Sequence, residues 1–515
     1  MNVLLITADQ WRGDCLSALG HDFAKTPNLD RLARQGTVFK RHFTTASPCA
    51  PGRASLYTGR YMMNHRVVAN GVPLSASHQT IATEVGQAGY DALLFGYTDT
   101  SADPRGRASD DPALRRLDNG MPGITPVVFM DDLQTPWLKW LREQGYDFPD
   151  GELGVFETQP TPGFGRTYTP ARYALEHSAS GFLTDAVIEQ LRNSADTPWF
   201  VHLSLWAPHP PFVAAAPFHA RVNADDVAPP VRAQTPELEA ALHPYLEFWL
   251  PNQQGTGIFA THDSTRNLEL DDSEVAQARA TYFGLMGEVD HHLGRLFSFL
   301  EGSGLDQQTL IIFTSDHGEQ LGDHWQFAKY GFYDQSFHVP LIIKPPAQLS
   351  GCSCGVQIDA FTEGVDVLPT ILDCLGLEIP AAVDGRSLRS FLQGVRPERW
   401  RTAAHWELDF RNYGQPPDRP PMGLARHECN FSVLRGERYK LVQFAALPPL
   451  LFDLETDPGE FVNLAVDPAC QTVLLGLTQE MLSWRMRHAD QSLTDFELTS
   501  SGVVSHAPSR HCFDA

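Results

Sequence analysis

The residues Asn2-Val3-Leu4-Leu5-Ile6-Thr7-Ala8-Asp9-Gln10 form an apolar run that ends in a carboxylate and an amide. An unbroken run of Val, Leu and Ile is typical of a strand that is buried on both faces of an α/β sheet. Further runs of this kind occupy residues 92–97, 199–205, 309–315 and 339–344. Helical or irregular segments separate these runs, so we predict an α/β fold.

Residues 277–300 predict the clearest helix of the chain. Their apolar residues fall on one stripe with helical spacing. We expect Glu288, His291 and His292 to lie on the exposed polar face of this helix, without a role in chemistry.

Two long segments, residues 101–170 and 206–275, are rich in Pro, Gly and Asp and lack strong periodicity. Such composition predicts long excursions from one end of the sheet. We expect these excursions to cover a site and to determine its specificity.

After Gly385 the sequence pattern changes. Short antiparallel strands are indicated at residues 431–434, 439–445 and 450–454, followed by an amphipathic helix at about residues 469–488. We therefore predict three parts: a large α/β domain over residues 1–385, a smaller α+β domain over 386–490, and a tail over 491–515. The tail is expected to lie in subunit contacts.

The composition limits the partners of the protein. The chain has 515 residues, a formal net charge of -23 and a pI near 5.2, which disfavours binding to nucleic acid or to an anionic membrane. No apolar run approaches a membrane span and no leader precedes the first strand run, so we expect a cytoplasmic protein. The 8 cysteines are scattered over a long chain and do not indicate a disulfide framework.

A cysteine opens the segment Cys49-Ala50-Pro51-Gly52-Arg53. Pro51 suits the first turn of a helix, so Cys49 is predicted at a helix N-terminus, where free N–H groups and the helix dipole favour anions. The phosphate loop of cysteine phosphatases needs a longer spacing between Cys and Arg, which argues against a thiolate phosphatase. A buried structural cysteine beside a helix start is the alternative interpretation.

Two carboxylates follow strand runs that are distant in the sequence. Asp9 comes after the first run, and Asp316 with His317 comes after the run at 309–315. Because ligands gather beyond the carboxyl ends of strands in α/β sheets, we expect these side chains to converge. Oxygen ligands with one imidazole suit Mn²⁺ or Ca²⁺. Taken singly, each Asp is equally compatible with a helix cap or a turn.

Several short motifs accompany these clusters along nearly the whole chain. They are Asp9-Gln10-Trp11-Arg12, Thr26-Pro27-Asn28-Leu29-Asp30-Arg31-Leu32, Cys49-Ala50-Pro51-Gly52-Arg53, Pro208-His209-Pro210-Pro211-Phe212, Ser315-Asp316-His317-Gly318-Glu319 and Asp457-Pro458-Gly459-Glu460. With them the chain resembles the sulfatase family of the alkaline phosphatase superfamily, closest to the branch of phosphonate monoester hydrolases and related arylsulfatases.

This resemblance implies a large mixed β-sheet flanked by helices and a smaller C-terminal α+β domain with a short antiparallel sheet. It also implies an enzyme that hydrolyses small anionic esters. Its Cys49 would be oxidised to formylglycine by a separate formylglycine-generating enzyme, and the chain would form a homodimer or a homotetramer.

The resemblance also implies roles for individual residues. One divalent metal ion, Mn²⁺ or Ca²⁺, would be held by Asp9, Gln10, Cys49, Asp316 and His317. Arg53 would hold the hydrated aldehyde, His209 and Lys329 would contact the ester oxygens, and Asn70 and Tyr97 would line the anion pocket. Composition alone predicts a solvated lysine at position 329 and a structural histidine at position 209, so these two roles depend on the motif context.

Asp99 interrupts the run of threonines that phosphonate monoester hydrolases usually carry after the position of Tyr97. A carboxylate in the substrate pocket would repel a dianion, such as a phosphate monoester, more than a monoanion. We therefore expect a metal-dependent hydrolase of sulfate monoesters that works by double displacement, with phosphonate monoesters and phosphodiesters as further substrates. The alternatives are a primary phosphonate monoester hydrolase or phosphodiesterase, and an inactive anion-binding homologue with unmodified Cys49.

Overall fold

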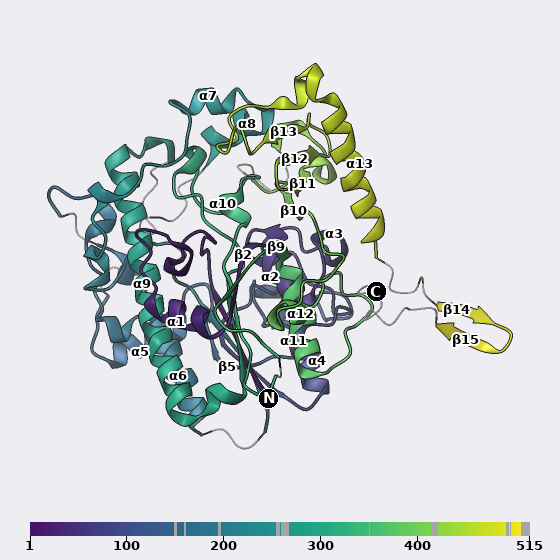
Figure 1. Ribbon diagram of the computed structural model, residues 1–515. Coiled ribbons are helices and arrows are strands. Elements are labelled where there is room, and N and C mark those ends of the chain that lie inside the picture. The colour runs from purple at the N-terminus through teal and green to yellow at the C-terminus, as the bar shows by residue number, and fades with distance from the viewer. Residues whose placement is uncertain are drawn as a thin grey trace.

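The computed structural model describes residues 1–148, 152–158, 161–193, 197–253, 258, 267–349, 351–413, 421–490, 494 and 496–505. At its centre lies an 8-stranded sheet with helices packed on both faces (Figure 1). The strand order is β5-β4-β6-β1-β7-β8-β2-β9. The expected α/β architecture with a large mixed sheet is confirmed.

The strands of this sheet are β1 (Asn2–Ala8), β2 (Thr37–Phe43), β4 (Asp91–Gly96), β5 (Thr125–Phe129), β6 (Trp199–Leu205), β7 (Thr309–Thr314), β8 (Leu341–Lys344) and β9 (Val356–Glu363). β1 is central and pairs in parallel with β6 and β7, and all its residues are buried. β8 runs antiparallel to β7 and β2, which makes the sheet mixed. All five predicted runs form strands, the last of them starting two residues later than expected.

Helices on the two faces of the sheet bury alternate residues of β1. Leu4 and Ile6 belong to the buried cluster that includes α1 (Pro27–Gln35), α5 (Thr135–Glu143), α6 (Ala179–Arg192) and α9 (Asp272–Ser303). Val3 and Leu5 belong to the cluster that includes α2 (Cys49–Thr58), α4 (Ile81–Gln87), α11 (Val367–Leu375) and α12 (Arg389–Leu392). Because side chains alternate along a strand, one continuous apolar run supplies both cores. The remaining helices are α3 (Met62–His65), α7 (Pro236–Ala240), α8 (Pro244–Asn252) and α10 (Asp334–Phe337).

The helix α9 is longer than predicted, and one expectation about it is wrong. Glu288 and His292 are buried, and only His291 is exposed. Glu288 accepts a hydrogen bond from the Ala215 N–H at 2.9 Å, and the His292 ring lies 3.0 Å from the Ser178 hydroxyl. The face is covered because α9 is packed between α6 and the segment around residue 218, so its polar groups find partners inside the protein.

A second sheet has the strand order β13-β12-β11-β10-β3. Its strands are β10 (Ala404–Asp409), β11 (Asn430–Arg435), β12 (Tyr439–Phe444), β13 (Leu450–Asp453) and, parallel to β10, the short β3 (Ala46–Ser47). β10 to β13 are antiparallel and α13 (Gln471–Arg487) follows them, which confirms the expected small antiparallel sheet and helix. The domain boundaries themselves stay predictions.

Only part of the predicted tail, residues 491–515, is described. There β14 (Phe496–Thr499) and β15 (Gly502–Ser505) pair as an exposed hairpin, which Figure 1 shows apart from the rest of the chain. The other tail residues lie outside the described ones, and the expected subunit contact stays a prediction.

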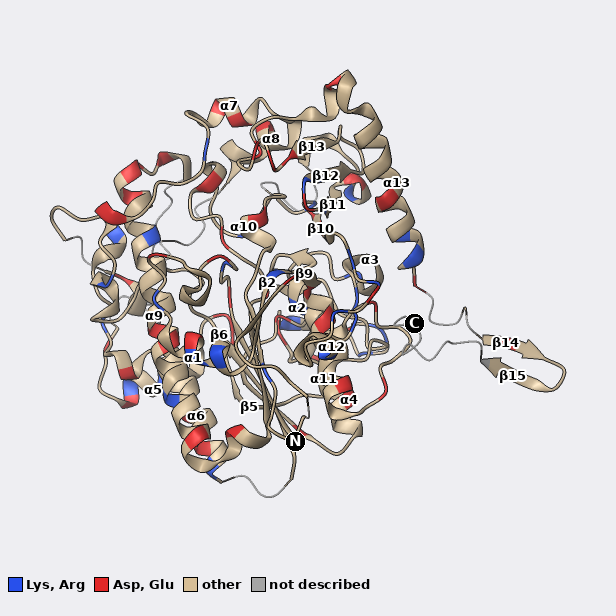
Figure 2. Ribbon diagram, in the orientation of Figure 1, with Lys and Arg blue, Asp and Glu red and all other residues tan. Residues whose placement is uncertain are grey.

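Over the described residues, no helix combines the length and the apolar character that a membrane crossing requires. Acidic segments are spread over the outer helices and loops (Figure 2), in keeping with the net charge of -23.

Candidate active site

The carboxyl ends of β1 and β7 bring two predicted metal ligands together. Asp9 directly follows β1 and Asp316 lies two residues beyond β7, and both side chains are buried. The adjacent parallel strands end at the same edge of the sheet, where ligands of α/β proteins gather. The Gln10 N–H points to Asp316 Oδ1 at 3.3 Å, which joins the two strand ends.

Cys49 is the first residue of α2, as predicted, and it faces this edge. Its Sγ lies 3.3 Å from His317 Nε2 and 3.1 Å from Lys329 Nζ. Gly52 lets the helix approach so closely, because a Cβ at this position would lie 2.6 Å from the Asp316 carbonyl oxygen. Burial raises the pKa of the Cys49 thiol, so an unmodified side chain would be a neutral thiol and a poor nucleophile.

Four of the five predicted metal ligands form one compact group. The ligand atoms of Asp9, Cys49, Asp316 and His317 lie within 4.8 Å of one another, and all four residues are buried. Asp9 Oδ1 is buried and has no hydrogen-bond partner among the described residues. His317 Nδ1 lies 3.0 Å from the Gly318 carbonyl, so the Nδ1–H donates there and leaves the Nε2 lone pair to the group. These features fit a divalent cation, which the unpaired carboxylate oxygen and the imidazole nitrogen that faces the group would bind.

Gln10, the fifth predicted ligand, lies beside the group. Its side-chain amide donates to the buried Glu319 carboxylate, and its Oε1 accepts a hydrogen bond from Lys329 at 3.1 Å. Glu319 also accepts from the N–H groups of Leu321 and Ala328. Glu319 was not predicted to have a role, although its place two residues after His317 offered a signal. It orients Gln10.

Arg53 is completely buried behind the two carboxylates. Its guanidinium donates to Asp316 Oδ2 at 2.9 Å, to Asp9 Oδ2 at 3.1 Å and to the Ser204 hydroxyl at 2.8 Å. It also lies 4.2 Å from the ring centre of Tyr97, whose hydroxyl donates to Asp9. In the described geometry Arg53 therefore orients the carboxylates, and its polar contacts do not include Cys49.

Lys329 and His209 reach the site from two different loops. Lys329 is buried, and its Nζ lies 2.9 Å from His209 Nε2. Burial opposes its charge, but Cys49 and Asp9 outweigh this and raise the pKa of Lys329. Burial and then Lys329 lower the pKa of His209 to about 3. His209 is therefore neutral, with Nδ1–H donated to the Pro210 carbonyl at 2.7 Å and Nε2 accepting from Lys329.

A cavity of about 240 Å³ opens at Cys49. It is lined by Asp9, Cys49, Ala50, Asn70, Gly71, Tyr97, Asp99, Leu117, Asp132, Trp206, His209 and Lys329. The three predicted pocket residues Asn70, Tyr97 and Asp99 are therefore all present. Asn70 Oδ1 accepts a hydrogen bond from the Ala50 N–H at 3.0 Å and caps the start of α2. Leu117, Asp132 and Trp206 come from the long excursions, whose irregular sequence gave no signal for single residues.

Asp99 lines the cavity, and its carboxylate contacts Arg53 behind the lining. Its Oδ2 lies 3.3 Å from Arg53 Nε, and its backbone has a φ of 51°. Asp118 holds this left-handed turn in place by accepting hydrogen bonds from the N–H groups of Thr98 and Thr100. Burial raises the pKa of Asp99 to about 7, with Arg53 acting in the opposite direction.

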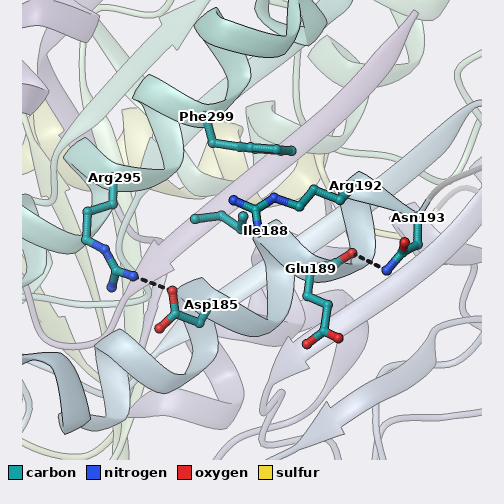
Figure 3. A pocket seen from close by; sticks show the side chains of 7 residues that line it. All are labelled: Asp185, Ile188, Glu189, Arg192, Asn193, Arg295 and Phe299. Carbon is teal, nitrogen blue, oxygen red and sulfur yellow. Dashed lines mark hydrogen bonds and ion pairs between the residues drawn. The ribbon is translucent and has the colours of Figure 1, made fainter.

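A second and larger hollow, of about 680 Å³, lies between α6 and α9 (Figure 3). Three of its four charged side chains have partners: Arg295 pairs with Asp185, and the guanidinium of Arg192 lies over the ring of Phe299. It is remote from the strand ends that carry the titratable cluster, so we assign the chemistry to the smaller cavity at Cys49.

Comparisons with known proteins agree with this geometry. A family model described as sulfatase matches residues 1–377, and one described as N-sulphoglucosamine sulphohydrolase, C-terminal, matches residues 322–487. The chain is 43% identical to the multifunctional alkaline phosphatase superfamily protein PehA of Trinickia caryophylli, over 98% of this chain and 99% of that protein. It is 27% identical to an arylsulfatase of Clostridium perfringens, over 90% of each chain.

The solved structure of a phosphonate monoester hydrolase from Agrobacterium radiobacter has a TM-score of 0.94 and 42% identity, covering 98% of this chain and 100% of that one. A phosphonate monoester hydrolase from Silicibacter pomeroyi has a TM-score of 0.91 and 39% identity over the same shares of the two chains. The chain belongs to the sulfatase family of the alkaline phosphatase superfamily, whose members hydrolyse ester bonds, and this membership implies a metal ion and a formylglycine derived from cysteine.

Proposed function

We propose that this protein hydrolyses singly charged esters, with sulfate monoesters preferred and with phosphonate monoesters and phosphodiesters as further substrates. The observation that carries the proposal is the position of Cys49. Its Sγ lies at the N-terminus of α2, next to His317 and Lys329, within the compact ligand group and at the inner end of the cavity.

In this proposal Cys49 is converted to formylglycine by a formylglycine-generating enzyme. As the hydrated aldehyde, residue 49 supplies one hydroxyl that attacks sulfur or phosphorus and a second that later expels the bound anion. A divalent cation, Mn²⁺ or Ca²⁺, held by Asp9, Asp316, His317 and residue 49 with Gln10 beside it, supplies Lewis-acid stabilisation of negative charge.

The chain's own residues position these groups and handle the proton. Arg53 holds Asp9 and Asp316 in fixed orientations, so the ligand group needs no rearrangement during the reaction. Lys329 stays charged and offers an N–H to the ester oxygen beside Cys49. His209 and Lys329, 2.9 Å apart, form the pair from which a proton passes to the departing alcohol.

Asp99 supports the preference for singly charged esters, because it adds a carboxylate to the cavity wall. The second candidate is a primary phosphonate monoester hydrolase or phosphodiesterase. The similarity to two phosphonate monoester hydrolases over 98% of the chain favours it. Relative kcat/KM values for a sulfate monoester, a phosphonate monoester and a phosphodiester with one common leaving group decide between the two candidates.

We also propose a homodimer or homotetramer in a reducing compartment, namely the cytoplasm. The described residues contain seven free cysteines, and none of these is joined in a disulfide, which supports the compartment. The oligomeric state rests on the resemblance to the family.

Mass spectrometry of the peptide that carries residue 49 tests the nucleophile. We expect the aldehyde form in active enzyme, and no turnover in Cys49→Ala. Cys374→Ala is the matched control, because Cys374 is another buried free cysteine and lies on α11, away from the cavity. Full activity from protein whose Cys49 is entirely a thiol would overturn the proposal and leave the anion-binding homologue as the better description.

A further inference from the structure

The cavity at Cys49 has two ends that differ in exposure. Asp9, Cys49 and Lys329 at the inner end are buried. The outer end is formed by exposed residues: Asn70, Gly71, Leu117 and Asp132. Because the anionic group of an ester must reach Cys49, the alcohol part of the substrate lies toward the outer end.

Asp132 brings an uncompensated negative charge to the outer end. Among the described residues it has no hydrogen bond and no ion pair, in contrast to Asp99, which contacts Arg53. Burial, and then the carboxylates of Asp118 and Asp131, raise the pKa of Asp132, and no cation within the described part of the chain counters them. The charge of Asp132 is therefore available to a ligand.

Trp206 adds an aromatic wall to the same cavity. Its indole N–H donates to the Pro210 carbonyl at 3.1 Å, and its ring centre lies 5.2 Å from that of Tyr97 and 4.9 Å from that of His209. These contacts fix the ring, while the side chain stays partly exposed toward the cavity. The face of an indole attracts cations.

We propose that the outer end of this cavity recognises a cationic group, such as an ammonium, on the alcohol part of the ester. This inference rests on the proposed function, because it takes the hydrolytic site at Cys49 as given. Asp132 and Asp99 supply the opposite charge, and Trp206 supplies the aromatic face. Among the lining residues Lys329 is the one Lys or Arg, and it lies at the inner end. An anionic alcohol would meet the unpaired carboxylate of Asp132, with the carboxylate of Asp99 beyond it held by Arg53.

Three aryl esters with substituents of similar size test the inference. The leaving phenol carries at its para position a trimethylammoniomethyl group, its neutral isostere neopentyl, or a carboxymethyl group. Each is made both as the sulfate and as the methylphosphonate monoester. The three phenols differ in pKa, so each kcat/KM is first corrected with the dependence on phenol pKa measured for simple aryl esters. We expect the corrected kcat/KM to be about fivefold higher for the cationic than for the neutral ester, from one exposed ion pair and one cation–π contact, and lowest for the anionic ester.

Two neighbouring aspartates provide matched variants. Asp132→Asn should reduce the cationic-to-neutral ratio to about twofold or less, because it removes the ion pair and leaves the indole. Asp131→Asn should lower the ratio much less than Asp132→Asn does, because Asp131 lies outside the cavity lining and caps α5 by accepting from the Thr135 N–H, which Asn can also do.

The outcomes separate this inference from the proposed function. A wild-type ratio near or below one, or a ratio that Asp132→Asn does not lower, overturns the cationic preference while hydrolysis of the neutral ester upholds the function. If none of the esters is hydrolysed, the proposed function fails and this inference fails with it.

Discussion

Lys329 offers the sharpest test of how the site handles the leaving group. Its Nζ is buried and lies near Gln10 Oε1, Cys49 Sγ and His209 Nε2, at 3.1, 3.1 and 2.9 Å. Lys329→Met keeps the aliphatic stem and removes the charge. A hydrogen bond from a charged donor contributes about 1.5–3 kcal/mol, so kcat/KM should fall by roughly 10- to 150-fold even for a good leaving group.

For a poor leaving group the loss should be larger. If Lys329 and His209 protonate the departing alcohol, the variant also loses this proton transfer, on which an alcohol of high pKa depends. Such general acid catalysis raises the rate by on the order of 100-fold or more. The assay is kcat/KM of wild type and variant over a series of aryl sulfates with increasingly basic phenols. We expect a steeper dependence on phenol pKa in the variant. Parallel dependences would refute the proton role and leave Lys329 as an electrostatic contact alone.

Lys344→Met is the control for loss of an internal lysine. Lys344 is also buried and donates to the Asp306 carbonyl, but it lies on β8 and outside the cavity lining. Its removal should leave kcat/KM per folded enzyme near the wild-type value. Melting curves of both variants separate lost folding from lost chemistry.

Three further predictions concern the metal, the substrate charge and pH. Asp316→Asn should lower metal content and turnover together, because a neutral amide is a weaker ligand; unchanged metal content by elemental analysis would place the ion elsewhere. Asp99→Thr should narrow the gap in kcat/KM between aryl sulfate and aryl phosphate monoesters by about tenfold at constant ionic strength, and equal effects on both would show that Asp99 does not face the substrate. Burial raises the pKa of Glu288 from 4.5 to about 7, so the folded state keeps a proton that the unfolded state has lost, and stability falls by about 3 kcal/mol as pH rises through this window. Glu288→Gln should remove this fall in urea unfolding at pH values below and above the window, and a stability difference from wild type that does not change with pH contradicts it.

In the large sheet, sequence analysis found the neighbouring strands at the centre, β4, β6, β1, β7 and β8. β1 and β7 read as unbroken apolar runs because helices cover them on both sides. β2, β5 and β9 lie at or near the sheet edges and lack an unbroken apolar run: β2 contains Lys40, Arg41 and His42, β5 contains Pro126, and β9 starts by alternating apolar residues with the exposed Gln357 and Asp359. Pattern alone does not separate such strands from loops.

The residues of the candidate site also differ in whether the sequence could predict them. Ligands at strand ends, such as Asp9 and Asp316, could be predicted because topology places them together. Lys329 and His209 lie on irregular loops, and only the family motifs indicated them. Trp206 and Asp132 could not be predicted, because their position depends on how the long excursions fold back over the sheet. Glu288 was misjudged because helical periodicity identifies a polar face but not what covers it.

The smaller sheet has a closer connection to the chemistry than its place at the end of the chain indicates. β3 pairs with β10 through Ala46 and Ser47 and lies just before Cys49. The Ser47 hydroxyl also donates to the Lys329 carbonyl at 2.5 Å. One short strand therefore completes the second sheet and positions both the residue proposed as nucleophile and the lysine opposite it. For this reason a boundary near residue 385 would not be a functional boundary, and the C-terminal sheet acts as a support for the active site.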